Sequence, residues 1–229
     1  MPPTDVQSVV EVWLATPEAA GRLDPEQLSP ADRAAWEAIR TRRRRQDWAS
    51  SRALLAAAPS AAGQARSLSH SHGYAALALA RGDASIGVDV EWLAPRDFLS
   101  LAELAFGPAE AAHLASLRDP AMASALFYEL WTLKEAFAKA LGLPLAEALR
   151  QCTWQFGADT VDVTLPTGQP WQAVVFAPRP ELRLALAIVG DPATPPAPSI
   201  RTMDWPPAAA AHWPVVQRWC AAGRGANPC

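Results

Sequence analysis

The chain has 229 residues, of which 50% are hydrophobic and 19% are charged, and its formal net charge is −3. A chain of this length can bury a substantial core in one large domain or two small ones. The acidic balance argues against a protein that binds nucleic acid through a generally basic surface. The three cysteines show the spacing of neither a zinc site nor a disulfide framework, so we expect reduced thiols.

The N-terminus and the hydropathy of the chain bear on its location. The first residues carry acids and prolines without a basic flank, which is not typical of a signal peptide. No apolar run approaches the roughly 20 residues that a membrane-spanning helix needs. We therefore expect a cytoplasmic protein with no membrane partner.

The first part of the sequence predicts a strand, two helices and a hairpin. Alternating apolar residues favour strands, Ser29-Pro30 is a typical helix start, and Arg81-Gly82-Asp83 is a typical turn. The predicted segments are, in chain order, a strand over 6–15, a helix from residue 30, a helix from the basic run 42–45 to about residue 58, and strands over 74–80 and 85–92.

The second part predicts helices followed by strands. The clearest helix covers about 121–141, because Gly142 and Pro144 are stop signals. The other predicted segments are helices near 99–105 and 108–117, strands within 153–165 and over 171–176 and 182–189, and a Pro/Ala linker over 191–199. The Trp-containing tail carries no prediction.

This order of elements predicts an α+β fold. We expect two similar α+β halves in one chain, related as a pseudo-twofold, each with a small antiparallel sheet packed on helices. The predicted halves are residues 1–92 and 93–191, followed by a linker and tail over 192–229.

Two carboxylates share one face of the strand predicted over 85–92, within the segment IGVDVEW. The apolar face holds the alternate residues Ile86, Val88, Val90 and Trp92. Asp89 and Glu91 project from the other face with Gly87. At about 4 Å and an effective dielectric near 20, their repulsion is on the order of 4 kcal/mol, so water, a raised pKa or a cation must relieve it. The strand taken alone favours the alternative, a solvated face of an edge strand.

The long predicted helix has two distinct faces. Its apolar stripe holds Leu126, Leu130, Leu133, Phe137 and Leu141, and the nearly opposite face holds Tyr128, Trp131, Glu135 and Lys139. A face exposed only to water would not need two aromatic residues, so Glu135 is a candidate partner for the strand carboxylates. A surface ion pair between Glu135 and Lys139 is the alternative. Lys134 lies at the edge between the faces, where it could reach a phosphate.

Two further segments offer groups that bind anions. The segment SLSHSHG, residues 67–73, is expected to be a tight loop with hydroxyl, imidazole and backbone N–H donors. The segment RRRRQDWASSRALL, residues 42–55, offers guanidinium groups, of which Arg52 lies beyond the basic run and is the better candidate for a fixed contact. The alternatives are surface histidines and a solvated helix face.

In this order, SLSHSHG, IGVDVE and FYELWTLKEAFAKALG resemble the 4′-phosphopantetheinyl transferases of the Sfp type. The Arg-rich segment is similar to the N-terminal helix of that family. The resemblance covers about residues 28–190 and is sharpest over 67–142. It implies an enzyme that uses Mg²⁺ to transfer the phosphopantetheine arm of coenzyme A to a serine of an apo acyl or peptidyl carrier protein. The other product is adenosine 3′,5′-bisphosphate.

The resemblance also implies roles for individual residues. The implied Mg²⁺ ligands are Asp89, Glu91 and Glu135. For the implied reaction we expect Glu135 and Lys139 to be catalytic, because a carboxylate can take the serine proton and an ammonium can stabilise the leaving oxygen. The implied coenzyme A contacts are Arg45, Arg52, Ser69, His70, Lys134 and Lys139. An active site at the interface of two halves would let a monomer suffice.

Three other functions fit parts of the sequence. A non-catalytic module that binds coenzyme A or a nucleotide would show the same phosphate contacts, but would not require Glu135 together with Lys139. A nucleic-acid-binding protein is opposed by the acidic balance and the clustered carboxylates. Another metal-dependent phosphoryl transferase or hydrolase would also use an Asp-x-Glu pair, but no Walker-type loop is present.

Overall fold

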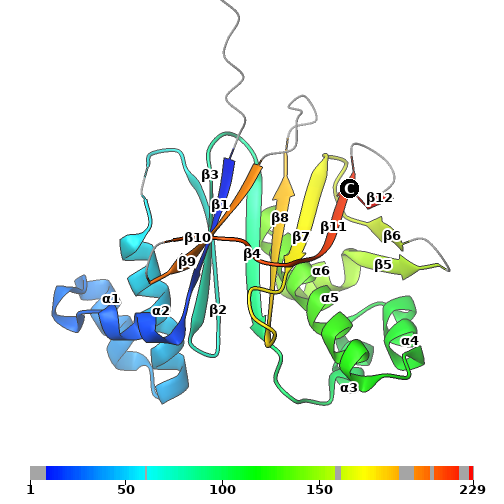
Figure 1. Ribbon diagram of the computed structural model, residues 1–229, viewed down its shortest axis with the longest axis horizontal. Coiled ribbons are helices and arrows are strands. Elements are labelled where there is room, and N and C mark those ends of the chain that lie inside the picture. The colour runs from blue at the N-terminus through cyan, green and yellow to red at the C-terminus, as the bar shows by residue number, and fades with distance from the viewer. Residues whose placement is uncertain are drawn as a thin grey trace, which may run out of the picture.

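The computed structural model describes residues 9–59, 61–157, 161–190, 199–206, 209–221 and 227–228. These residues form two five-stranded sheets, a two-stranded sheet and a set of helices, which confirms the predicted α+β class (Figure 1). The helices are the 3-10 turns η1 (Pro17–Arg22) and η2 (Pro25–Gln27), and α1 (Pro30–Ala38), α2 (Arg42–Ala57), α3 (Phe98–Ala105), α4 (Pro108–Ser116), α5 (Pro120–Leu141) and α6 (Leu145–Gln151). Among the described residues, no helix combines the length and apolarity needed to span a bilayer.

The first sheet has the strand order β10 (Ala209–Ala211), β9 (Ser199–Trp205), β1 (Val9–Ala15), β3 (Tyr74–Ala80) and β2 (Ala65–Ser71). The second has the order β12 (Asn227–Pro228), β11 (Val215–Ala221), β7 (Trp171–Phe176), β8 (Leu182–Val189) and β4 (Ser85–Trp92). Neighbouring strands are antiparallel, except that β9 runs parallel to β1. The small sheet pairs β5 (Thr153–Phe156) with β6 (Val161–Thr164).

The apolar residues of the strands alternate between the two faces of each sheet and form three clusters, which arranges the molecule in layers. Val12 of β1 and Val88 of β4 belong to one cluster between the two large sheets. Leu77 of β3 packs with Leu54 of α2 on the outer face of the first sheet. Ala185 of β8 packs with α5 on the outer face of the second sheet. The layers are therefore α2, first sheet, second sheet and α5, as Figure 1 shows.

Each large sheet takes strands from distant parts of the chain. Strand β4 closes the predicted N-terminal half, yet it pairs with β8 in the second sheet. The predicted linker over 191–199 lies mostly outside the described residues, and β9 returns from it to the first sheet. The tail that carried no prediction contributes β9 to β12. Both sheets thus contain strands from distant parts of the chain.

The cysteines depart in part from the expectation of reduced thiols. Cys152 is a free, fully buried thiol, and burial raises its pKa to about 11. Cys220 is disulfide-bonded, so the expectation is wrong for this residue.

Candidate metal centre

Three carboxylates meet where β4 and α5 lie against each other. Asp89 and Glu91 come from β4 and Glu135 comes from α5, and one oxygen from each lies within 4.8 Å of the others. Asp89 is 2% exposed, and the two glutamates are partly buried. The strand face that carries Asp89 is therefore covered by α5, which excludes the solvated edge strand.

Gly87 brings α5 close enough to β4 for the three carboxylates to meet. A Cβ atom at this position would lie 1.8 Å from the carbonyl oxygen of Ala136, so only glycine fits. Asp89 follows Gly87 on the same face of the strand, and Glu135 directly precedes Ala136. The close contact thus fixes the distance between the strand carboxylates and the helix carboxylate.

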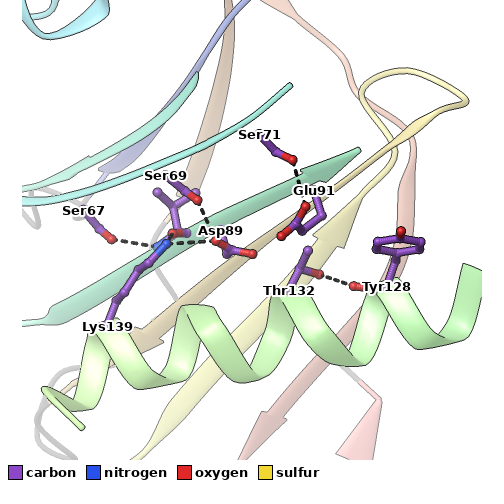
Figure 2. A network of polar contacts seen from close by, with 9 residues as sticks. Ser67, Ser69, Ser71, Asp89, Glu91, Tyr128, Thr132 and Lys139 are labelled. Atoms are coloured by element: carbon purple, nitrogen blue, oxygen red, sulfur yellow. Dashed lines mark hydrogen bonds and ion pairs between the residues drawn. The ribbon is translucent and has the colours of Figure 1, made fainter. Parts of the chain in front are cut away.

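The two carboxylate oxygens of Asp89 differ in their hydrogen bonds. Its Oδ1 accepts hydrogen bonds from the hydroxyl of Ser69 at 2.6 Å and from the ammonium of Lys139 at 2.9 Å (Figure 2). Its Oδ2 is buried and has no hydrogen-bond partner. A buried carboxylate oxygen almost always has a partner, so this atom is suited to bind a cation.

The glutamates of the cluster show the electrostatic cost of placing three acids together. Burial, and then the charge of Asp89, raises the pKa of Glu91 above its ordinary value of 4.5. The same two causes raise the pKa of Glu135 to about 7. A cation among the three oxygens would relieve this repulsion. Carboxylate oxygens are ligands of hard cations such as Mg²⁺ and Ca²⁺, so the residues fit such an ion.

Lys139 joins the centre from α5, one turn beyond Glu135. Its ammonium donates to Oδ1 of Asp89 and, at 2.8 Å, to the carbonyl oxygen of Val88. An ammonium has three hydrogens, so one is left without a described partner. About 30% of the side chain is exposed, which leaves this hydrogen accessible to a ligand.

The segment 67–73 was expected to be a loop, but most of it is strand β2. Residues 65–71 pair in register with β3, and the turn is confined to His72 and Gly73, with φ angles of 50° and 85°. Asp47 of α2 holds this turn, because its buried carboxylate accepts a hydrogen bond from the backbone N–H of Gly73. Ser69 therefore projects from a regular strand toward β4.

Ser71 links β2 to the carboxylates in the same way, and sequence reasoning missed it. Its hydroxyl donates to Glu91 at 2.8 Å and accepts from the backbone N–H of Trp92 at 3.3 Å. The only hydrogen of this hydroxyl is donated to Glu91. In the contact of 3.2 Å between the hydroxyl and Nδ1 of His72, the nitrogen must therefore carry the hydrogen and donate it. A neutral His72 then carries its lone pair on Nε2. Its ring stacks on Trp92, with centroids 6.0 Å apart.

The remaining candidates for phosphate contacts do not meet the carboxylates. His70 is exposed, and its cross-strand partner Ala75 packs on the α2 side of the first sheet, so His70 lies on that side. Arg45 donates to the carbonyl oxygen of Ile39 at 3.0 Å. Arg52 lies 3.1 Å from Asp32 and over the ring of Trp48. These three residues lie on β2 and α2 and take no part in the hydrogen bonds that hold the three carboxylates.

The prediction that Lys134 contacts a phosphate is contradicted by its position. Its side chain is 0% exposed, and its ammonium donates to Glu110 at 2.9 Å and to two carbonyl oxygens, those of Leu149 and Cys152. Glu110 in turn accepts from the backbone N–H groups of Gly107 and Trp154. All three hydrogens of the ammonium are occupied, so Lys134 joins α5 to its neighbours in the core.

Trp131 also lies elsewhere than predicted. It packs with Phe127, at 5.8 Å between ring centroids, and with Phe106 at 6.2 Å. It therefore belongs to the core around α3 and α5 rather than to the face of Glu135. Tyr128 does lie on the face toward β4, where its hydroxyl donates to the carbonyl oxygen of Ala94 at 2.8 Å.

Comparison with known proteins places the centre within a matched segment. Residues 85–187 match the profile of the 4′-phosphopantetheinyl transferase superfamily. The chain is 34% identical over 124 residues to the 4′-phosphopantetheinyl transferase HetI of Nostoc sp., covering 54% of this chain and 51% of HetI. It is 39% identical over 85 residues to the "Putative 4′-phosphopantetheinyl transferase slr0495" of Synechocystis sp., covering 37% of this chain and 34% of that protein. The chain thus spans about half of one relative and about a third of the other.

Proposed function

Because residues 85–187 belong to the 4′-phosphopantetheinyl transferase superfamily, we propose that this chain transfers the phosphopantetheine arm of coenzyme A to a carrier-protein serine. The acceptor is an apo acyl or peptidyl carrier protein, and adenosine 3′,5′-bisphosphate is released. The observation that carries the proposal is the cluster of Asp89, Glu91 and Glu135, in which Oδ2 of Asp89 is buried without a partner.

The metal of the proposed reaction is Mg²⁺, held by these three carboxylates. Magnesium keeps several water or substrate ligands beside its protein carboxylates, which would leave room for the diphosphate of coenzyme A. When bound, the ion would neutralise charge on the diphosphate and orient it. The raised pKa values of Glu91 and Glu135 support this proposal, because a cation would remove the repulsion that causes them.

Glu135 is the proposed proton acceptor for the carrier serine. The serine oxygen forms a bond to the phosphorus that bears pantetheine, and the bond from that phosphorus to the bridging oxygen breaks. The serine proton passes to Glu135, which lies in the carboxylate cluster and one helical turn from Lys139. The bridging oxygen leaves with adenosine 3′,5′-bisphosphate.

Lys139 is the proposed stabiliser of the leaving oxygen. Two of its hydrogens bind Asp89 and the carbonyl of Val88, which fixes the ammonium beside the carboxylates. The third can donate to the oxygen on which negative charge develops. Because its position is set before substrate binds, little reorganisation is needed during the reaction.

The nucleotide end of coenzyme A is proposed to extend toward α2. His70 is exposed on the α2 side of the first sheet, and Arg45 and Arg52 belong to α2 and are at least partly exposed. Cationic and imidazole groups on neighbouring elements suit a phosphate. Ser69 is not included, because its hydroxyl hydrogen is directed to Asp89.

The proposed enzyme acts as a monomer in the cytoplasm. Its centre needs no second copy, because one chain supplies both the carboxylates of β4 and the serines of β2. No nucleic acid or membrane takes part in the proposed reaction. Coenzyme A and carrier proteins are intracellular molecules, which agrees with a cytoplasmic site of action.

The test is to incubate the chain with coenzyme A, Mg²⁺ and apo carrier proteins of the fatty-acid, polyketide and peptide classes. We expect at least one carrier to gain the mass of a phosphopantetheine arm, and we expect a chelator to prevent this. Binding of coenzyme A without any mass gain on the three classes would contradict the transferase and favour a binding module.

A further inference from the structure

Strand β2 presents a row of three hydroxyl groups to the edge of β4. Ser67, Ser69 and Ser71 occupy alternate positions, so their side chains share one face of the strand, and each is 8% exposed. All three form hydrogen bonds with residues of β4 (Figure 2). We call these residues the serine row.

The members of the serine row bind different parts of β4. Ser67 accepts a hydrogen bond from the backbone N–H of Val88 at 2.9 Å and has no contact with a carboxylate. Ser69 donates to Oδ1 of Asp89, and Ser71 donates to Oε2 of Glu91. The row therefore combines a purely structural contact between the two sheets with two contacts to the candidate metal ligands.

We propose that Ser69 is a positioning residue for the metal centre, which directs Oδ2 of Asp89 toward the ion by holding Oδ1. This inference rests on the proposed function, because it assumes a metal at Asp89, Glu91 and Glu135. It gives Ser69 a role other than the phosphate contact that the family resemblance implies.

The hydrogen bonds around Asp89 support this role. A carboxylate oxygen has about two lone pairs, and those of Oδ1 are taken by Ser69 and Lys139. Turning the carboxylate away from this orientation would break both bonds. The other oxygen, Oδ2, is thereby kept buried and without a hydrogen-bond partner, in the residue that forms the cluster with Glu91 and Glu135.

The burial of Ser69 and the direction of its hydrogen oppose a direct contact with substrate. The residue is 8% exposed, and its single hydrogen is donated to Asp89 over 2.6 Å. Donation to a phosphate would require that bond to break. A hydrogen bond to a metal-binding carboxylate fixes its orientation, and loss of such a partner typically weakens metal binding about 10- to 100-fold.

The docking of the two sheets then sets the geometry of the metal centre. The serine row belongs to the first sheet, whereas Asp89 and Glu91 belong to the second. Two effects of a serine substitution can be separated: a weaker contact between the sheets and a lost orientation of the carboxylate. Ser67 contacts only the backbone of β4, whereas Ser69 contacts the carboxylate of Asp89.

The test is calorimetric titration of the full chain with MgCl₂, comparing wild type, Ser69→Ala and Ser67→Ala. We expect Ser69→Ala to raise the Kd for Mg²⁺ about 10- to 100-fold, and Ser67→Ala to leave it within about threefold of wild type. Thermal unfolding in chelator shows whether each variant is folded. Ser69→Thr and Ser69→Val provide a second comparison, because they have nearly the same shape and only threonine keeps the hydroxyl. Threonine should retain the affinity and valine should lose it.

Two results would overturn the positioning role. Wild-type affinity in Ser69→Ala, or in Ser69→Val should the alanine variant not fold, would show that the hydroxyl does not orient Asp89. Equal weakening by Ser67→Ala and Ser69→Ala would show that the row only joins the sheets. Failure of the proposed function is seen separately, because wild type itself would then modify no carrier protein, whatever its affinity for Mg²⁺.

Discussion

Replacing Glu135 by glutamine should stabilise the protein in the absence of metal. Burial, followed by the charge of Asp89, raises the pKa of this carboxyl from its ordinary value of 4.5 to about 7. A raised pKa means that the folded state binds the proton more tightly than the unfolded state. The stability that the neutral carboxyl provides is therefore full below pH 4.5 and is lost as the pH rises through about 7.

The size of this effect follows from the two pKa values. Each pH unit between them corresponds to about 1.4 kcal/mol, so ionised Glu135 costs up to about 3 kcal/mol above pH 7. Glutamine resembles the neutral acid in shape and cannot ionise. At pH 8.5 in chelator, Glu135→Gln should thus raise the free energy of unfolding by up to about 3 kcal/mol, which is roughly 6–12 °C in Tm for a chain of this size.

Denaturant unfolding at pH 8.5 and pH 4.5, with chelator present, measures this difference. The gain at pH 8.5 should nearly vanish at pH 4.5, and Mg²⁺ should stabilise wild type but not Glu135→Gln. Glu147→Gln is the matched control, because Glu147 forms only an exposed pair with Gln151 and its loss should change stability by about 0.5 kcal/mol or less. A Glu135→Gln protein that is no more stable than wild type at pH 8.5 would refute the reasoning.

Two further predictions concern the elements that hold the centre. Gly87→Ala should move α5 away from β4, since the new Cβ would lie 1.8 Å from a backbone oxygen. Denaturant unfolding should show a loss of at least about 1–3 kcal/mol, with weaker Mg²⁺ binding, and unchanged values for both would contradict the close packing. Lys134→Met should cost about 3–5 kcal/mol of stability, because it leaves Glu110 buried without its cation. The double variant Lys134→Met/Glu110→Leu should recover part of that loss in denaturant unfolding. Were Lys134 a phosphate contact instead, the single variant would keep its stability and raise the KM for coenzyme A.

The carboxylate cluster could be predicted because each part of it follows a local period. Alternation along a strand places Asp89 and Glu91 on one face, and the helical period places Glu135 and Lys139 one turn apart. What these periods cannot supply is the distance between strand and helix. That distance depends on Gly87, whose missing side chain lets Ala136 approach, and this contact becomes visible only in the folded chain.

Most errors of the sequence-based predictions arise where contacts between distant segments determine the position of a side chain or a strand. Lys134 lies between two helix faces in the sequence pattern, but Glu110 and two carbonyl groups beyond α5 enclose it. Pairing of β9 with β1 joins residues about 190 positions apart, and no local pattern signals it. The expected loop at 67–73 is different, because alternating serines were a period-two signal for a strand that the histidines and glycine obscured.

The most direct test of the account compares carrier modification by Asp89→Asn, Glu135→Gln and the control Glu147→Gln at saturating Mg²⁺ and coenzyme A. The measured quantity is the rate at which an apo carrier accepted by wild type gains the mass of a phosphopantetheine arm. We expect the two cluster variants to be folded and to show no transfer, and the control to match wild type. Transfer at the wild-type rate by Asp89→Asn or Glu135→Gln would contradict the central claim that these carboxylates form the metal centre of the reaction.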